Sequence, residues 1–215
     1  AITRPEHITT WFAEAIETVR SSAGGKPTLA FDIGGTKLLV ALVDGDRVLA
    51  TREEPTPRGA DAEAWCDRVA ALAEAFKGDF DAAGGCVTGV VQDGRWTALN
   101  PETLPIPPGF ALGEGLARRL GVEVALYNDA QAAAWGEYRF GAGAGADLVF
   151  LTVSTGIGGG VVLDGRLRTG KSGIAGSAGL TRLVGREGRG ALLESAASGP
   201  AFAADATTIR VLNWE

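Results

Sequence analysis

The sequence predicts an α/β fold made of two similar half-domains that face one another. Segments with the period of strands alternate with segments of helical period along most of the chain. A unit of strand, glycine turn, strand and Asp-Gly turn occurs at residues 28–45 and again at 148–165. The 32 glycines gather at such turns, a pattern typical of tight turns and of close backbone approach to a ligand.

Residues 1–22 are predicted to form one amphipathic helix, because their apolar residues recur at helical spacing. Thr3 and Glu6 match a capping box ahead of this helix. The Ser-Ser-Ala-Gly-Gly sequence at 21–25 has the composition of a flexible joint. We therefore expect residues 1–25 to be a terminal helix and linker, separate from the rest of the chain.

The first half-domain is expected at residues 26–140, where strand and helix periods alternate. Its predicted strands are 28–33, 37–43, 47–52, 84–91 and 122–127, and its predicted helices are 62–76, 111–120 and 130–138. The second half-domain is expected at residues 141–215. It has predicted strands at 148–154 and 160–163, a glycine turn at 155–159 and a helix at 192–204.

Charge and composition exclude several classes of partner. The formal net charge is −6 and no run of Lys or Arg occurs, so we expect neither a nucleic acid nor a membrane as partner. The longest apolar stretches, such as 148–153, are too short to span a bilayer. Cys66 and Cys86 lack CxxC spacing and are expected to be buried free thiols, which fits a cytoplasmic protein.

The first glycine turn has residues suited to binding the phosphates of ATP. The backbone amides of Gly34 and Gly35 can approach an anion closely. Thr36 adds a hydroxyl and Lys37 a positive charge. Asp32 ends the preceding strand, where its carboxylate can hold a water of the Mg²⁺ that accompanies phosphate. The alternative is a plain β-hairpin whose glycines only provide a positive φ.

A second glycine turn favours the phosphate interpretation over the plain hairpin. It offers Thr155, Gly156, Gly158 and Gly159. Three glycines within four positions are more than a plain hairpin needs. We therefore expect the two turns to form two walls of one phosphate-binding cleft.

Four motifs, in this order, resemble those of the ROK (repressor/ORF/kinase) family of sugar kinases. They are Phe31-Asp32-Ile33-Gly34-Gly35-Thr36-Lys37, Leu99-Asn100-Pro101, the stretch 127–135 and the stretch 152–160. The similarity covers about residues 28–204 and is greatest to the bacterial N-acetylmannosamine kinases. The resemblance implies an actin/hexokinase-like (ribonuclease H-like) fold with duplicated β-β-β-α-β-α half-domains. It also implies ATP with Mg²⁺ as phosphoryl donor and an amino sugar or hexose as acceptor.

The resemblance assigns roles to four polar residues. Asp129 is similar to the general base that takes the proton of the sugar 6-hydroxyl, and a carboxylate suits that task. Asn100, Asn128 and Glu194 resemble the sugar ligands of the family. Each has a structural alternative: an N-cap for Asp129, a turn for the asparagines and a solvent-facing helix position for Glu194.

Residues 165–172 satisfy the GxxxxGK[ST] pattern of a P-loop, but the context does not fit. A P-loop needs a strand directly before it and a helix directly after it. Here an Asp-Gly turn overlaps the start of the pattern, and Ser-Gly-Ile-Ala-Gly at 172–176 does not start a helix. We interpret this match as chance.

The sequence departs from the family in three places. Ser177 and Leu180 stand where relatives carry a sugar ligand and the histidine of a Gly-His pair. Residues 185–193 contain none of the cysteines of the family's zinc loop, and the only histidine is His7, so we expect no zinc site. The last third of the family fold is also absent, which predicts an incomplete second half-domain.

Residues 1–22 resemble the C-terminal end of an N-acetylmannosamine-6-phosphate 2-epimerase, which suggests a fused bifunctional protein. The leading hypothesis is therefore an ATP-dependent kinase that phosphorylates the 6-hydroxyl of N-acetylmannosamine in sialic acid catabolism. The alternatives are a glucokinase-like hexose kinase, and a sugar-binding or degenerate ROK protein without catalysis. The resemblance also suggests a homodimer.

Overall fold

The computed structural model describes residues 25–206 except residues 46, 58–60, 100–104, 144 and 185–189. The helix predicted at 1–22 lies outside the described residues, and so does Asn100. Within the described part the α/β class is confirmed, and no helix there is long and apolar enough to cross a membrane.

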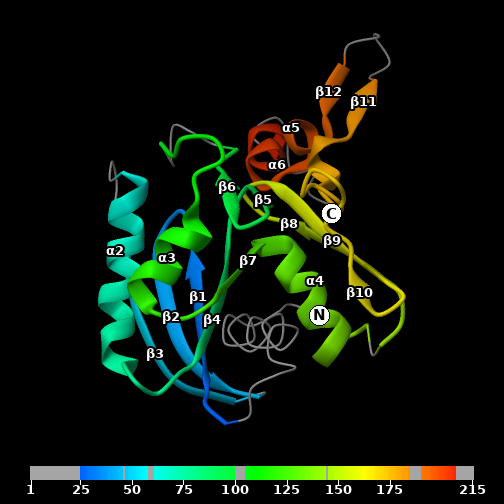
Figure 1. Cartoon of the computed structure of the whole chain (residues 1–215). Coiled ribbons are helices and arrows are strands. Elements are labelled where there is room, and N and C mark those ends of the chain that lie inside the picture. Colours follow the sequence, from blue (N-terminus) through cyan, green and yellow to red (C-terminus); the bar gives the residue numbers. More distant parts are fainter. Residues whose placement is uncertain are drawn as a thin grey trace, which may run out of the picture.

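A five-stranded mixed sheet forms the centre of the molecule (Figure 1), in the order β3-β2-β1-β4-β7. Its strands are β1 (Thr28–Ile33), β2 (Lys37–Asp44), β3 (Arg47–Pro55), β4 (Ala82–Val87) and β7 (Val124–Asn128). The first three make an antiparallel meander, whereas β4 and β7 run parallel to β1. The carboxyl ends of β1, β4 and β7 therefore meet at one edge of the sheet, where ligands bind in α/β folds.

Helices cover both faces of this sheet (Figure 1). They are α2 (Ala62–Ala73), continued by the 3-10 turn η1 (Glu74–Phe76), then α3 (Leu112–Leu120) and α4 (Asp129–Phe140). The first two pack on one face, over a core in which the rings of Trp65 and Trp96 lie 5.8 Å apart. Helix α4 lies on the other face, between the large sheet and a second sheet.

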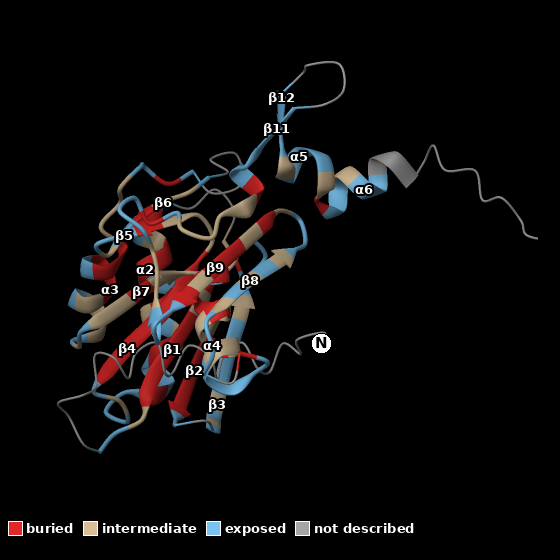
Figure 2. Cartoon of the chain, turned by 90° about the vertical axis from the view of Figure 1, so that its right-hand side faces the viewer, coloured by how far each residue is buried: buried red, intermediate tan, exposed pale blue. Residues whose placement is uncertain are grey.

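The second sheet repeats the order of the first meander. It consists of β8 (Leu148–Val153), β9 (Ile157–Leu163) and β10 (Arg166–Leu167), in the order β10-β9-β8. The repeated hairpin unit is thus confirmed. One face of β8 packs toward α4, while Val149, Leu151 and Val153 on its other face are 58–63% exposed (Figure 2).

Several predicted boundaries were wrong. The strand predicted at 84–91 ends at Val87, because the chain bends at Gly89, which has a φ of 101°. A hairpin comes next, with β5 (Val90–Gln92) and β6 (Arg95–Thr97). The turn predicted at 155–159 is shorter, because β9 already begins at Ile157.

The C-terminal part also differs from the single helix predicted at 192–204. Ser198 is extended, so two helices form, and Pro200, which lacks an N–H, stands in the first turn of the second. The elements are η2 (Ala178–Leu180), β11 (Arg182–Val184), β12 (Gly190–Leu192), α5 (Leu193–Ala197) and α6 (Gly199–Ala206). The β11–β12 hairpin projects from the body (Figure 1), and the six residues of its two strands are exposed.

Helix α2 depends on a single side-chain cap at its start. The Asp61 carboxylate accepts a hydrogen bond from the Ala64 amide at 2.7 Å. We expect Asp61→Ala to lower the free energy of unfolding by about 1 kcal/mol, because a backbone donor loses its partner. Asp61→Asn should keep most of the stability, since an amide oxygen also accepts this bond. Urea denaturation tests this, and an equal loss in both variants would contradict the cap.

Candidate active site

Two of the predicted acidic residues meet at the edge where the parallel strands end. Asp32 is the fifth residue of β1, and Asn128 and Asp129 join the end of β7 to the start of α4. The negative charge of Asp129 contributes to raising the pKa of Asp32, so the two carboxylates interact electrostatically. The strand–Asn–Asp–helix junction and the first glycine turn therefore lie at the same edge of the sheet.

Asn128, not Asp129, is the N-cap of α4. Its side-chain oxygen accepts from the amides of Ala130 and Gln131 at 3.0 and 3.1 Å. Its amide nitrogen donates to the Gly89 carbonyl at 2.8 Å and to Asp129 Oδ1 at 2.9 Å. Both donors and both acceptor positions of this side chain are thus engaged. A sugar hydroxyl that binds Asn128 has to share or replace one of these bonds.

Asp129 is held in place and is exposed at the edge. Its Oδ1 accepts from Asn128 Nδ2 and from the Ala130 amide, both at 2.9 Å. Both bonds end on Oδ1, which leaves Oδ2 to accept a proton from a substrate. Surrounding protein atoms desolvate the carboxylate and raise its pKa, while hydrogen bonds from the Ala130 amide, the Asn128 side chain and its own backbone amide lower it in part. Such a group is better suited to proton transfer near neutral pH than an ordinary aspartate.

The first glycine turn is anchored by Thr56, a residue that the sequence motifs did not include. The Gly34 amide donates to the Lys37 carbonyl at 3.1 Å, which closes the hairpin. The hydroxyl of Thr56 donates to the Gly34 carbonyl at 2.7 Å, and its amide donates to the Thr36 carbonyl at 2.9 Å. Neither Gly34 nor Gly35 has a positive φ. The explanation of these glycines as providers of positive φ was therefore wrong.

Lys37 lies beside the turn, and its ammonium pairs with Glu53 at 2.9 Å. Both side chains are at least half exposed, so this pair is weak and leaves the lysine able to exchange partners. The next residue, Glu54, is engaged by Arg68 instead. A hollow of about 350 Å³ opens between Thr36 and the end of β3.

Asp32 is half-buried, and its carboxyl is protonated at higher pH than usual. Burial raises its pKa to about 6, the thiol of Cys86 opposes this by donating to Oδ1 at 3.3 Å, and the charge of Asp129 raises it further. The carboxyl therefore changes its charge in a pH range where most aspartates are already ionised.

This raised pKa predicts how stability varies with pH. The folded pKa of Asp32 lies above its unfolded value. The contribution of this carboxyl to the free energy of unfolding is therefore fully present below about pH 4 and is lost as the pH rises through about 6. Asp32→Asn should therefore be more stable than the wild type at pH 8, by about 2 kcal/mol, and no more stable at pH 4. Urea denaturation at both values tests this, and a difference independent of pH would rule out the burial effect.

The glycines at and directly after the second turn lie where a Cβ would collide with neighbouring atoms. A Cβ on Gly158 would lie 3.0 Å from the Ala130 Cβ, and one on Gly159 would lie 2.5 Å from two carbonyl oxygens. A Cβ on Gly160 would lie 2.5 Å from the Ala134 Cβ. None of these glycines has a positive φ. The close fit of β9 against α4 therefore explains Gly158 and Gly160, and the approach of the Phe150 and Gly176 carbonyls explains Gly159, without any ligand.

Glu194 lies against this second turn. Its Oε2 accepts from the Ile157 amide at 2.8 Å, and a Cβ on Gly156 would collide with the same carboxylate. The amide of Ile157 is therefore already occupied by a protein acceptor. Thr155 remains exposed at the tip of the turn.

Gln131 is a second structural residue that the motifs did not identify by role. It is 2% exposed on α4, and its amide donates to the carbonyls of Gly173 and Ala175 at 3.0 and 3.2 Å. It thus fixes the loop that precedes Ser177 and Leu180. A buried glutamine on an otherwise alanine-rich helix face was the only sequence signal.

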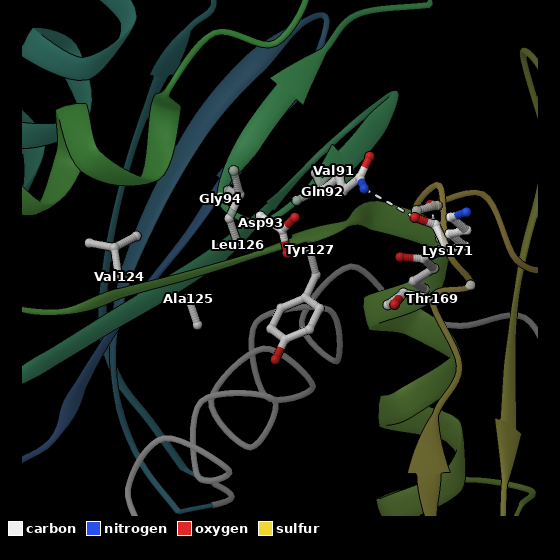
Figure 3. Close-up of a pocket in the computed structure, with 13 residues that line it drawn as sticks. Val91, Gln92, Asp93, Gly94, Val124, Ala125, Leu126, Tyr127, Thr169 and Lys171 are labelled. Atoms are coloured by element: carbon white, nitrogen blue, oxygen red, sulfur yellow. Dashed lines mark hydrogen bonds between the residues drawn. The ribbon is translucent and has the colours of Figure 1, made fainter.

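A cavity of about 410 Å³ opens beside β7, and neither Asp32 nor Asp129 lines it. It runs along the free edge of β7 and is closed by the β5–β6 turn and the loop 169–173 (Figure 3). None of the predicted site residues lines it. The loop overlaps the P-loop-like stretch 165–172, which is followed directly by turns at 173–177 and not by the α-helix that a P-loop needs. In the described part, no three His, Cys, Asp or Glu side chains gather as a metal site.

The fold and the carboxylates at this edge define a class of protein. The sequence profile of the ROK family matches residues 28–212, and the chain belongs to this family. The structure superposes on a ROK family glucokinase from Streptomyces griseus, in complex with glucose and AMPPNP, with a TM-score of 0.69 and 38% identity. That match covers 85% of this chain and 60% of the other. The predicted actin/hexokinase-like fold is thereby confirmed.

Two named relatives are similar to this chain over most of its length. The chain is 52% identical to "Bifunctional enzyme NanE/NanK" of Brucella melitensis biotype 1 over 93% of its length, but spans only 38% of that protein. It is 43% identical to "N-acetylmannosamine kinase" of Salmonella paratyphi A over 83% of its length and spans 64% of that protein. The chain thus covers less than two thirds of the length of these relatives.

Proposed function

We propose that the protein containing this chain transfers the γ-phosphoryl group of ATP to the 6-hydroxyl of N-acetylmannosamine. The observation that carries this proposal is the position of Asp129, held by Asn128 at the edge where Asp32 and the first glycine turn also lie. The similarity to N-acetylmannosamine kinase and to the bifunctional NanE/NanK enzyme supports the choice of sugar.

In this mechanism Asp129 is the general base. Oδ2 of Asp129 accepts the proton of the sugar 6-hydroxyl. The hydroxyl oxygen attacks the γ-phosphorus in line, and ADP leaves. Asn128 keeps the carboxylate oriented through the bond between Nδ2 and Oδ1. A carboxylate with a raised pKa retains the proton more readily than an ordinary aspartate.

The phosphates belong at the first glycine turn. The amides of Gly34 and Gly35, the Thr36 hydroxyl and the Lys37 ammonium are the donors that would contact them. Lys37 would then exchange its weak pair with Glu53 for a phosphate. Mg²⁺ enters with ATP as part of the substrate, and Asp32 is the carboxylate expected to hold its water. Thr155, Gly156, Gly158 and Gly159 supply the opposite wall of the cleft.

The sugar would be bound by Asn100, Asn128, Asp129 and Glu194. Glu194 is anchored to the second turn by the Ile157 amide, so a sugar bound to it would lie close to the phosphate site. Ser177 and Leu180 replace two groups found in relatives of the family, and we infer that they alter affinity for the sugar rather than the chemistry. Zinc has no part in this proposal.

A coupled assay of ADP release over glucose, mannose, N-acetylglucosamine and N-acetylmannosamine tests the function. We expect the highest kcat/KM with N-acetylmannosamine, measured on the protein that contains this chain. A preference for glucose would favour a hexose kinase such as the Streptomyces relative. Sugar binding without ADP release would favour a sugar-binding protein without catalysis.

The N-terminal segment supports a fusion to an epimerase. The Brucella match covers more of the chain than residues 28–212, and only three residues come after residue 212. It therefore includes part of the segment that resembles an N-acetylmannosamine-6-phosphate 2-epimerase. Such a fusion would place the enzyme that consumes the product on the same polypeptide. We further infer a cytoplasmic homodimer, which size-exclusion chromatography with light scattering tests.

A further inference from the structure

Cys86 faces Asp32 across the two central strands. The two residues are direct partners in the parallel register of β1 and β4, so their side chains share one face of the sheet. The thiol of Cys86 donates to Asp32 Oδ1 at 3.3 Å. Cys86 is 1% exposed. The thiol end of this contact is therefore closed to solvent, while the half-buried carboxylate lies just before the first glycine turn.

The surroundings of Cys86 give its thiol few other partners. It packs in an apolar cluster with Ala30, Ala41, Val43 and Ala132. Burial and the nearby carboxylates raise the pKa of the thiol well above its ordinary value. The sulfur therefore keeps its proton and remains a hydrogen-bond donor. Asp32 Oδ1 is the acceptor that it meets.

The second cysteine of the chain, Cys66, is buried but does not contact the proposed site. Cys66 on α2 is 0% exposed and packs in the core between α2 and the large sheet. No hydrogen bond from its thiol is found among the described residues. The two cysteines thus have equal burial but different contacts. Only Cys86 touches a residue of the proposed site.

We propose that Cys86 is a positioning residue for the phosphoryl transfer. Its thiol fixes the orientation of the Asp32 carboxylate, which lies just before the first glycine turn. This inference rests on the proposed function. A thiol is a weak donor, so it restrains the carboxylate without holding it as an arginine would. Asp32 can therefore still turn one oxygen toward the nucleotide when it binds.

Two variants separate positioning from packing. Cys86→Ser keeps a donor of similar size, whereas Cys86→Ala removes the donor. We expect Cys86→Ala to weaken binding of Mg·ADP about fivefold and to raise KM for Mg·ATP to a similar degree, while KM for the sugar stays constant. Cys86→Ser should restore values close to those of the wild type.

Cys66→Ala is the matched control, because it removes an equally buried thiol that contacts no site residue. Its nucleotide affinity should equal that of the wild type. Isothermal titration calorimetry gives the affinities, and thermal unfolding shows whether a variant has lost stability instead. If Ser and Ala at position 86 weaken nucleotide binding equally, the thiol acts through packing and the proposal fails.

Infrared spectroscopy of the S–H stretch tests the contact without any ligand. The chain has two cysteines, so, when this chain alone is measured, Cys66→Ala leaves Cys86 as its one thiol and Cys86→Ala leaves Cys66. We expect the Cys86 band at lower frequency, since hydrogen bonding weakens the S–H bond, and it should move up when Asp32→Ala is added. Identical bands would overturn the contact. A shifted band in a protein that binds no nucleotide would instead reject the proposed function, and with it the positioning role of Cys86 beside the first glycine turn.

Discussion

Asp129→Asn is expected to lower kcat for sugar phosphorylation by about 10²- to 10⁴-fold, because the proton of the attacking hydroxyl loses its acceptor. The dissociation constant for the sugar should change little, since an asparagine keeps the size of the side chain. Its oxygen can also still accept from Asn128 Nδ2 and from the Ala130 amide. Steady-state kinetics and calorimetric titration with the sugar measure the two quantities separately.

Asp61→Asn is the matched control for this variant. It makes the same chemical change at the start of another helix, where Asp61 caps α2. We expect its kcat to equal that of the wild type. In the wild type, kcat/KM should also fall as the pH drops through the raised pKa of Asp129, because the protonated carboxyl is no base. An unchanged kcat in Asp129→Asn would exclude Asp129 as the base.

Gly160→Ala should cause the second large effect, through the contact between β9 and α4. The new methyl group would lie 2.5 Å from the Ala134 Cβ and 2.9 Å from the Gln131 Cα. The helix must shift away from the strand, and such overpacking lowers stability by about 3 kcal/mol. Activity should fall as well, since the first residue of this helix is Asp129. Urea denaturation and ADP release measure the two losses.

The control for this substitution is Gly190→Ala, which is also in a strand. The nearest atoms to a methyl group there lie 3.9 Å away, which is ordinary contact. We expect a change in the free energy of unfolding within about 1 kcal/mol. A similar loss in both variants would mean that glycine flexibility, not the approach of α4, is what Gly160 provides.

The central strands were predictable because burial imposes their pattern. Residues 28–33 are buried almost throughout, and the repeated hairpin unit marks where each meander begins. The β11–β12 hairpin was missed because its residues are exposed, including Leu183 and Val184, so no alternation of apolar and polar residues identifies it. The β5–β6 hairpin does have a sequence signal in Asp93-Gly94, a dipeptide typical of tight hairpin turns.

The site was predictable where sequence neighbours determine it. Asn128 and Asp129 come at the end of a strand and start a helix, so their position at the edge is set by the local pattern. The contact of Cys86 with Asp32 depends on the register between β1 and β4, which the sequence does not state. Likewise, the glycines of the second turn suggested a ligand, whereas each lies where a Cβ would collide with protein atoms from other parts of the chain.

The order of strands in the large sheet has a consequence for synthesis on the ribosome. Strand β1 pairs with β2, the next strand along the chain, but its other edge pairs with β4. Asp32 and its partner Cys86 are 54 residues apart, so at normal rates of translation β4 emerges roughly 3 to 10 s after β1. During that interval the nascent meander exposes an unpaired apolar edge, which is a target for chaperones and for aggregation with other nascent chains.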